Sequence, residues 1–181
     1  MIIVAAAIAA VLSVPLSGAS LTRLATVSFR SVWLIWIALG MQVIITVVPR
    51  FPNTLGQPIH LLTFALAAVF MWSNRRLPGV SLVALGAGLN LVAVATNGGT
   101  MPASATAWRI AGLPTSGSGF ENSNVIANAR VAWLGDVFAI PKGWPLANVF
   151  SIGDVVVVIA ISYFLHVWCR LDVRTSAAVA Q

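Results

Sequence analysis

The sequence predicts an all-α integral membrane protein, a bundle of five transmembrane helices with a long extracytoplasmic segment between the fourth and fifth helices. Of its 181 residues, 59% are hydrophobic and 8% are charged, whereas soluble domains are typically about 25% charged. The mean hydropathy is +0.96. Apolar runs long enough for membrane spans divide the chain, and arginines lie mainly between them. These observations assign residues 1–170 to one membrane domain.

The first apolar run, residues 2–16, has no positive residue before it, and Arg23 and Arg30 follow it. Positive charge after an apolar run holds the C-terminal end of that run in the cytoplasm. We therefore expect a retained span with its N-terminus outside. A cleaved signal peptide is the alternative, since Ser17-Gly18-Ala19 offers small residues for cleavage.

Helix-breaking residues delimit the next spans. Pro49 ends the second span, Pro58 stands in the first turn of the third, and Asn97-Gly98-Gly99 is a helix-ending signal after the fourth. The expected spans are residues 31–48, 59–72 and 79–96.

The connection that follows, residues 98–146, contains four prolines and a Gly/Ser-rich stretch. We expect this outer segment to pack on the membrane surface or on the helix bundle. The fifth span is expected at residues 147–168. Residues 171–181 are rich in Ala and Ser, and we expect a disordered cytoplasmic tail.

The positive charges predict the orientation of the bundle. One side of the membrane would receive arginines 23, 30, 75, 76, 170 and 174. The other side would receive Arg50, Arg109, Arg130 and Lys142, spread over a longer stretch that also holds Glu121 and Asp136. The positive-inside rule therefore places the N-terminus outside and the C-terminus in the cytoplasm.

The net charge of +6 does not indicate a nucleic-acid partner, because the charges are scattered between apolar runs and form no basic stripe. We expect the lipid bilayer to surround the protein. The sequence leaves open whether the chain also binds a membrane-protein partner or a second copy of itself. The single cysteine, Cys169, cannot form an intrachain disulfide.

Polar residues within apolar spans are costly and are expected to point into the bundle. Gln42, Asn90 and Asp154 lie at similar distances from the outer ends of their spans, about 9–10 Å at 1.5 Å per residue, and we expect them to form one polar layer. Ser151 and Asn148 would extend this layer along the last helix. The layer is either a ligand pocket centred on Asp154 or a set of hydrogen bonds that fixes helix register.

A second group of polar residues is expected at the outer rim of the bundle. His60 is either a ligand or an interfacial residue bonded to backbone or water. The turn after the fourth span begins with Asn97, Gly98 and Gly99. It forms either a backbone nest for an anion or a helix cap followed by a tight turn. The other expected rim residues are Asp136 and Arg130.

No motif for a hydrolase, a zinc peptidase or a thiol redox enzyme is present. The two histidines lie in opposite halves of the membrane, and His166 with Cys169 alone does not make a metal site. We therefore expect neither a catalytic site nor a metal site, and no cofactor.

Three motifs in combination resemble an uncharacterised family of small bacterial membrane proteins, a domain of unknown function. They are NGGTMP at 97–102, LGDVF at 134–138 and NVFSIGD at 148–154. The resemblance covers nearly the whole chain. It implies a stand-alone, multi-pass protein of the bacterial plasma membrane, and it supplies no activity.

The leading hypothesis is a non-catalytic membrane protein. It would bind a lipophilic or small polar ligand, or a partner, through its outer segment and polar layer. The alternatives are a proton-coupled carrier or membrane enzyme using Asp154, and a purely structural accessory subunit. A site predicts a concave opening that reaches Asp154, whereas a structural contact predicts saturated hydrogen bonds and no cavity.

Overall fold

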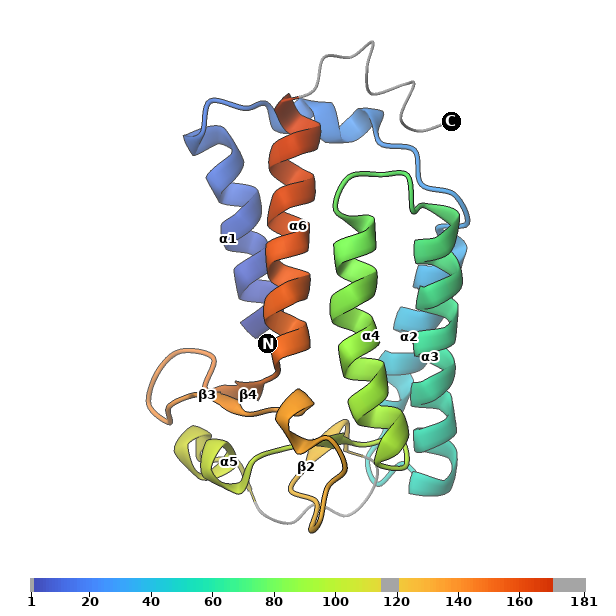
Figure 1. Ribbon diagram of the computed structural model, residues 1–181, viewed down its shortest axis with the longest axis vertical. Helices are drawn as coiled ribbons and strands as arrows, with labels where there is room; N and C mark the ends of the chain where they lie inside the picture. Colours follow the sequence, from blue (N-terminus) through green and yellow to red (C-terminus); the bar gives the residue numbers. More distant parts are fainter. Residues whose placement is uncertain (1, 115–120, 171–181) are drawn as a thin grey trace.

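The computed structural model describes residues 2–114 and 121–170, and the protein is mostly helical (Figure 1). Figure 1 shows the long helices side by side, with α5 and the strands gathered at one end. The long helices are α1 (Ile2–Leu16), α2 (Trp33–Val47), α3 (Asn53–Ser73), α4 (Val80–Thr96) and α6 (Ile152–Arg170). The expected tail, residues 171–181, lies outside the described residues.

Shorter elements connect the long helices. A 3-10 helix, η1 (Leu21–Thr26), follows α1, and the segment between α4 and α6 carries the remaining elements. These are β1 (Met101–Pro102), α5 (Ala105–Ala111), β2 (Ser123–Asn124), η2 (Ala132–Leu134), β3 (Phe138–Ile140) and β4 (Asn148–Phe150). The expected outer segment therefore contains strands as well as helix.

Helix α6 is the centre of the bundle. It packs most extensively against α4, and α1 covers another side of it, while α2 packs on α3. A Cβ added to Gly153 of α6 would lie 2.6 Å from the carbonyl oxygen of Gly86 in α4, and one added to Gly86 would lie 2.7 Å from that of Gly153. The two backbones can approach this closely only because both positions are glycine.

Two helices begin five or more residues away from the starts that the sequence predicts. α3 begins at Asn53 rather than 59, because Pro52 holds the extended N-cap conformation and Pro58 lies inside the helix. α6 begins at Ile152 rather than 147, because residues 148–150 form β4 and pair antiparallel with β3. The later start of α6 changes the place of Asp154, which lies in the first turn.

The segment between α4 and α6 folds against the end of the bundle. β1 pairs in parallel with β2, and Ala103 forms a parallel bridge with Asp136 on its other side. Met101 and Leu134 pack on Ala93 and Val94 of α4. These contacts attach the outer segment to the helix that also contacts α6.

The burial pattern of helix α3 is the reverse of that in a helix of a water-soluble protein. Its buried residues are Gly56, His60 and Thr63, whereas Leu62 and Val69 are 47% and 54% exposed. Amphipathic helices in water bury their apolar stripe instead. The apolar side chains of α3 therefore face away from the bundle.

Two helices, α3 with 21 residues and α6 with 19, are long and apolar enough to cross a membrane. The shorter apolar helices are Ala5–Leu16, Trp33–Val47 and Val80–Thr96. By length and composition, the described residues therefore support membrane association.

Candidate functional site

Asp154 is part of the N-terminal cap of α6. The backbone N–H of Asp154 donates to Ser151 Oγ at 3.0 Å, and the backbone N–H of Ser151 donates to Asp154 Oδ2 at 3.0 Å. This reciprocal pair is a capping box, in which each side chain satisfies a backbone donor of the first turn. Asp154 thus lies at the start of α6, and its expected depth of about 10 Å inside a helix is corrected.

Asn90 of α4 joins this cap to the neighbouring helix. Its Nδ2 donates to Asp154 Oδ1 at 2.7 Å, and its Oδ1 accepts a hydrogen bond from Ser151 Oγ at 2.8 Å. A Cβ on Gly153 would lie 2.0 Å from Asn90 Oδ1, so the network requires glycine between Ser151 and Asp154. The structure therefore brings together three of the residues that the sequence predicted for a polar layer.

Gln42 belongs to a different interface. Its Oε1 accepts a hydrogen bond from Thr63 Oγ1 at 3.3 Å, and the same hydroxyl lies 2.6 Å from the carbonyl oxygen of His60. The expected layer of Gln42, Asn90 and Asp154 is therefore replaced by separate contacts, one between α2 and α3 and one between α4 and α6. Similar depth does not determine which neighbour a side chain faces.

Asp136 and Asp154 each stand in a Gly-Asp-Val sequence, at 135–137 and 153–155. Asp136 is buried in the outer segment. Its backbone N–H donates to the carbonyl of Pro102 at 2.9 Å, and a Cβ on Gly135 would lie 2.0 Å from that oxygen. Ser123 Oγ donates to Asp136 Oδ2 at 2.5 Å. Burial raises the pKa of Asp136 to about 6, the hydrogen bond from Ser123 lowers this pKa, and the charge of Asp154 raises it.

The residues after α4 attach the outer segment to the bundle. Asn97 Nδ2 donates to the carbonyl of Arg130 at 2.8 Å, and the Arg130 N–H donates back to Asn97 Oδ1 at 2.9 Å. The N–H of Gly99 donates to the carbonyl of Val94 at 2.9 Å, which ends the helix. Gly98 and Gly99 both have positive φ. Of the two expectations for this turn, the geometry matches a helix cap.

His60 is buried beneath this turn. Its Nδ1 lies 3.0 Å from the carbonyl oxygen of Gly99. A Cβ on Gly99 would lie 2.7 Å from Cβ of Gln57, so glycine allows the turn to approach α3. His60 thus links α3 to the outer segment.

A cavity of about 320 Å³ lies where the outer segment meets α3, α4 and α6. Both aspartates line it, although they come from separate Gly-Asp-Val sequences. The other polar lining residues are His60, Asn90, Asn122, Ser123 and Asn148. A second space of about 460 Å³ shares part of this lining and extends to Thr46 and Trp108. The cavity therefore collects five of the eleven residues predicted for the layer and the rim.

The cavity is rich in hydrogen-bond acceptors. Asp136 and Asp154 line it, and Asn122, another lining residue, has a buried Oδ1 with no hydrogen-bond partner within residues 2–114 and 121–170. Such acceptors complement a ligand that carries N–H or O–H donors or a positive charge. In the same residues, no three His, Cys, Asp or Glu side chains gather as a metal site would require.

The sequence interpretation missed two features of this site. Ser151-x-x-Asp154 before an apolar run is the signature of a capping box and was readable. Asn122 and Ser123 carried no comparable signal, because a β1–β2 pairing across a long loop brings them to Asp136.

Comparisons with known proteins relate the chain to a family without assigning an activity. The model of the Family of unknown function (DUF5317) matches residues 26–166. An uncharacterized protein of Thermotoga maritima is 28% identical over 115 residues, which are 64% of this chain and 67% of that relative. No solved structure matches the chain. The resemblance to a family of unknown function is confirmed.

Proposed function

The chain belongs to this family of unknown function, and we propose that it is a multi-pass protein of the bacterial plasma membrane that binds a small cationic ligand at its outer face. It acts as a binding protein and not as an enzyme. The single observation that carries the proposal is the convergence of Asp136, Asp154 and Asn122 on one cavity.

The membrane location is supported by the inverted burial of α3, whose apolar side chains face outward around buried His60 and Thr63. Lipid requires apolar outer surfaces and confines polar side chains to the interior. In this proposal α1, α2, α3, α4 and α6 are the five spans. The two long apolar helices are the strongest candidates among them.

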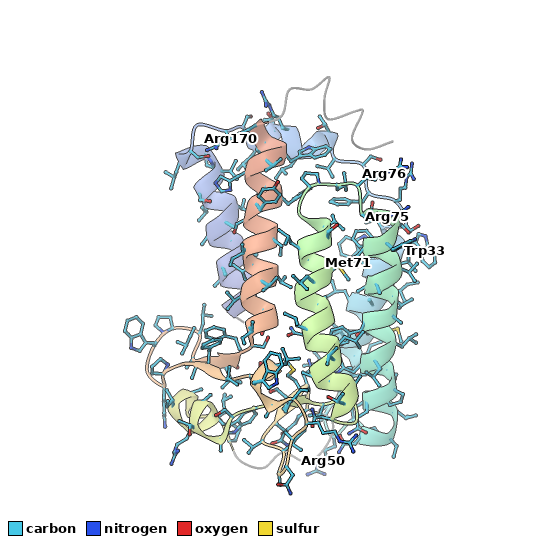
Figure 2. All side chains as sticks on the ribbon, viewed as in Figure 1. Trp33, Arg50, Met71, Arg75, Arg76 and Arg170 are labelled. Atoms are coloured by element: carbon cyan, nitrogen blue, oxygen red, sulfur yellow. The ribbon has the colours of Figure 1, made fainter. Side chains whose placement is uncertain are left out.

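The orientation is supported by the distribution of arginines. Figure 2 shows Arg75, Arg76 and Arg170 at one end of the bundle and Arg50 at the other. By the positive-inside rule, the end with Arg170 faces the cytoplasm. The cavity then lies on the extracytoplasmic side, with the N-terminus of α1 outside.

The chemistry of the lining supports an organic cation as the ligand. Two carboxylates in one partly desolvated cavity repel each other, and a bound ammonium or guanidinium group would relieve this repulsion. The apolar lining residues Phe64, Met101 and Val149 complement a short hydrocarbon body.

Binding can be tested with simple probes. Purified protein in lipid nanodiscs is expected to be stabilised against heat by alkylammonium ions and not by alcohols of the same shape. Asp136→Asn should abolish this stabilisation, whereas Glu121→Gln, which removes a carboxylate outside this cavity, should retain it. Equal stabilisation by cations and alcohols, or an unchanged response of Asp136→Asn, would exclude the cation site.

A proton-coupled carrier is the second candidate, and the raised pKa of Asp136 beside Asp154 favours it. A carrier predicts cation-dependent proton flux into proteoliposomes, which Asp136→Asn should abolish. A binding protein predicts no flux above that of empty vesicles. A purely structural role, favoured by the Asn90–Ser151–Asp154 network, predicts neither flux nor stabilisation by cations.

A further inference from the structure

A second, chemically different space lies between α3 and α4, away from the two aspartates. It is a groove of about 330 Å³, lined almost entirely by apolar and small side chains. Its small residues include Ala68, Ala84, Ala87 and Gly88. A Cβ added to Gly88 would meet no atom within 4 Å, so the groove is open beside this glycine.

One end of the groove is cationic. Arg75 lies at this end, its guanidinium 4.5 Å from the centre of the Trp72 ring, and its Nη1 donates to the carbonyl of Trp72 at 2.8 Å. These two contacts hold the guanidinium in place, and a guanidinium has five N–H donors in all. Figure 2 shows Arg76 beside Arg75 at this end of the bundle, with Met71 between α3 and α4.

The length of the groove matches one leaflet of a bilayer. On α4 its lining runs from Val80 to Leu91, a rise of about 16 Å at 1.5 Å per residue. Half of a hydrocarbon core of about 30 Å is about 15 Å. An extended acyl chain would therefore fill the groove from the headgroup level to the bilayer centre.

We propose that this groove binds one acyl chain of an anionic phospholipid, with the lipid phosphate on Arg75. The guanidinium fork suits phosphate oxygens, which accept paired N–H donors. Trp72 lies at the headgroup level, where tryptophan is enriched in membrane proteins. The inference rests on the proposed membrane location and is independent of the cation site in the outer cavity.

The test is native mass spectrometry of the full chain titrated with phosphatidylglycerol or phosphatidylcholine of equal chain length. One retained phosphatidylglycerol per chain is expected, in clear preference to phosphatidylcholine. Arg75→Gln should weaken phosphatidylglycerol binding roughly fivefold and phosphatidylcholine binding less, because the choline ammonium already offsets the phosphate charge of that lipid. Arg170→Gln is the charge control at the same end of the bundle and should retain the preference.

A groove-filling variant separates a lipid site from other occupants. Gly88→Leu should abolish the retained lipid, while Gly40→Leu, at another helical glycine with no atom within 4 Å, should keep it. Equal retention of both lipids, or of lipid by Gly88→Leu, would overturn the proposal. A dimer that Gly88→Leu disrupts would assign the groove to a second copy instead. Unchanged unfolding temperatures without added lipid confirm that the variants fold, and failure of the cation test would leave these outcomes unaffected.

Discussion

The two Gly-Asp-Val sequences place their aspartates on one cavity by different structural means. In both, glycine allows a close approach, of Gly135 to Pro102 and of Gly153 to Asn90. Asp154 is held by its own helix, through the capping box with Ser151. Asp136 is held by distant segments, which pair with it in the outer segment.

In both Gly-Asp-Val sequences the glycine allows another segment to approach the backbone closely. The properties of each aspartate carboxyl group depend instead on the residues that surround it. Burial raises the pKa of Asp136 to about 6. Asp154 instead accepts hydrogen bonds from the backbone N–H of Ser151 and from Asn90. Burial therefore sets the pKa of Asp136, whereas Asp154 fixes the α4–α6 contact.

The largest effect is expected from Gly153→Ala. The new methyl group would lie 2.0 Å from Asn90 Oδ1 and 2.6 Å from the carbonyl oxygen of Gly86, so α4 and α6 must separate. We expect a loss of about 3 kcal/mol in the free energy of unfolding, seen as a lower unfolding temperature in detergent. Gly40→Ala is the matched control, with no atom within 4 Å, and equal stability of the two variants would contradict the close crossing.

The next effect is the pH dependence of the free energy of unfolding that Asp136 contributes. Because the pKa of Asp136 is raised from 3.8 to about 6 on folding, its contribution to stability is full below pH 3.8 and is lost as the pH rises through 6. The amplitude is at most about 3 kcal/mol, at 1.36 kcal/mol per pH unit. Asp136→Asn should remove this dependence in chemical denaturation at pH 4–8.

Glu121→Gln is the control for that titration, because Glu121 lies in the same segment but does not line the cavity with both aspartates. Its profile should keep the loss of stability near pH 6. A profile of Asp136→Asn that matches the unmodified chain would assign the titration to another group.

A smaller and more local effect is expected from Gly135→Ala. Its methyl group would lie 2.0 Å from the carbonyl oxygen of Pro102, so the bridge between Ala103 and Asp136 must open, at about 2 kcal/mol. Hydrogen exchange should increase at Met101 and Ala103, whose N–H groups donate to β2 and its neighbour, and stay unchanged in α6. Faster exchange throughout α6 would show that the outer segment and the bundle unfold together.

The smallest effect is expected from Ser151→Ala, which removes the hydroxyl of the helix cap. A lost N-cap typically costs about 1 kcal/mol, measured by unfolding in detergent. Ser123→Ala is the counterpart at the other aspartate. Because the Ser123 hydrogen bond lowers the pKa of Asp136, its removal should move the pH transition upward, while Ser151→Ala should leave that transition in place.

Composition and periodicity predicted the long helices well, because apolar runs and prolines are local signals. They also predicted the meeting of Asn90, Ser151 and Asp154, since buried polar groups require partners. They did not predict the Gln42–Thr63 contact, because depth along a helix does not specify the facing neighbour. The strands of the outer segment were missed because each has only two or three residues and depends on partners distant in sequence.

The packing of α1 on α6 has a consequence for biosynthesis. Ala10 and Val14 of the first helix are buried against Leu165 and Cys169 of α6, so this contact cannot form until α6 has been synthesised. Until then, α1 lacks the apolar surface that buries these two side chains. Assembly of the bundle is therefore completed only when α6 packs against both α1 and α4.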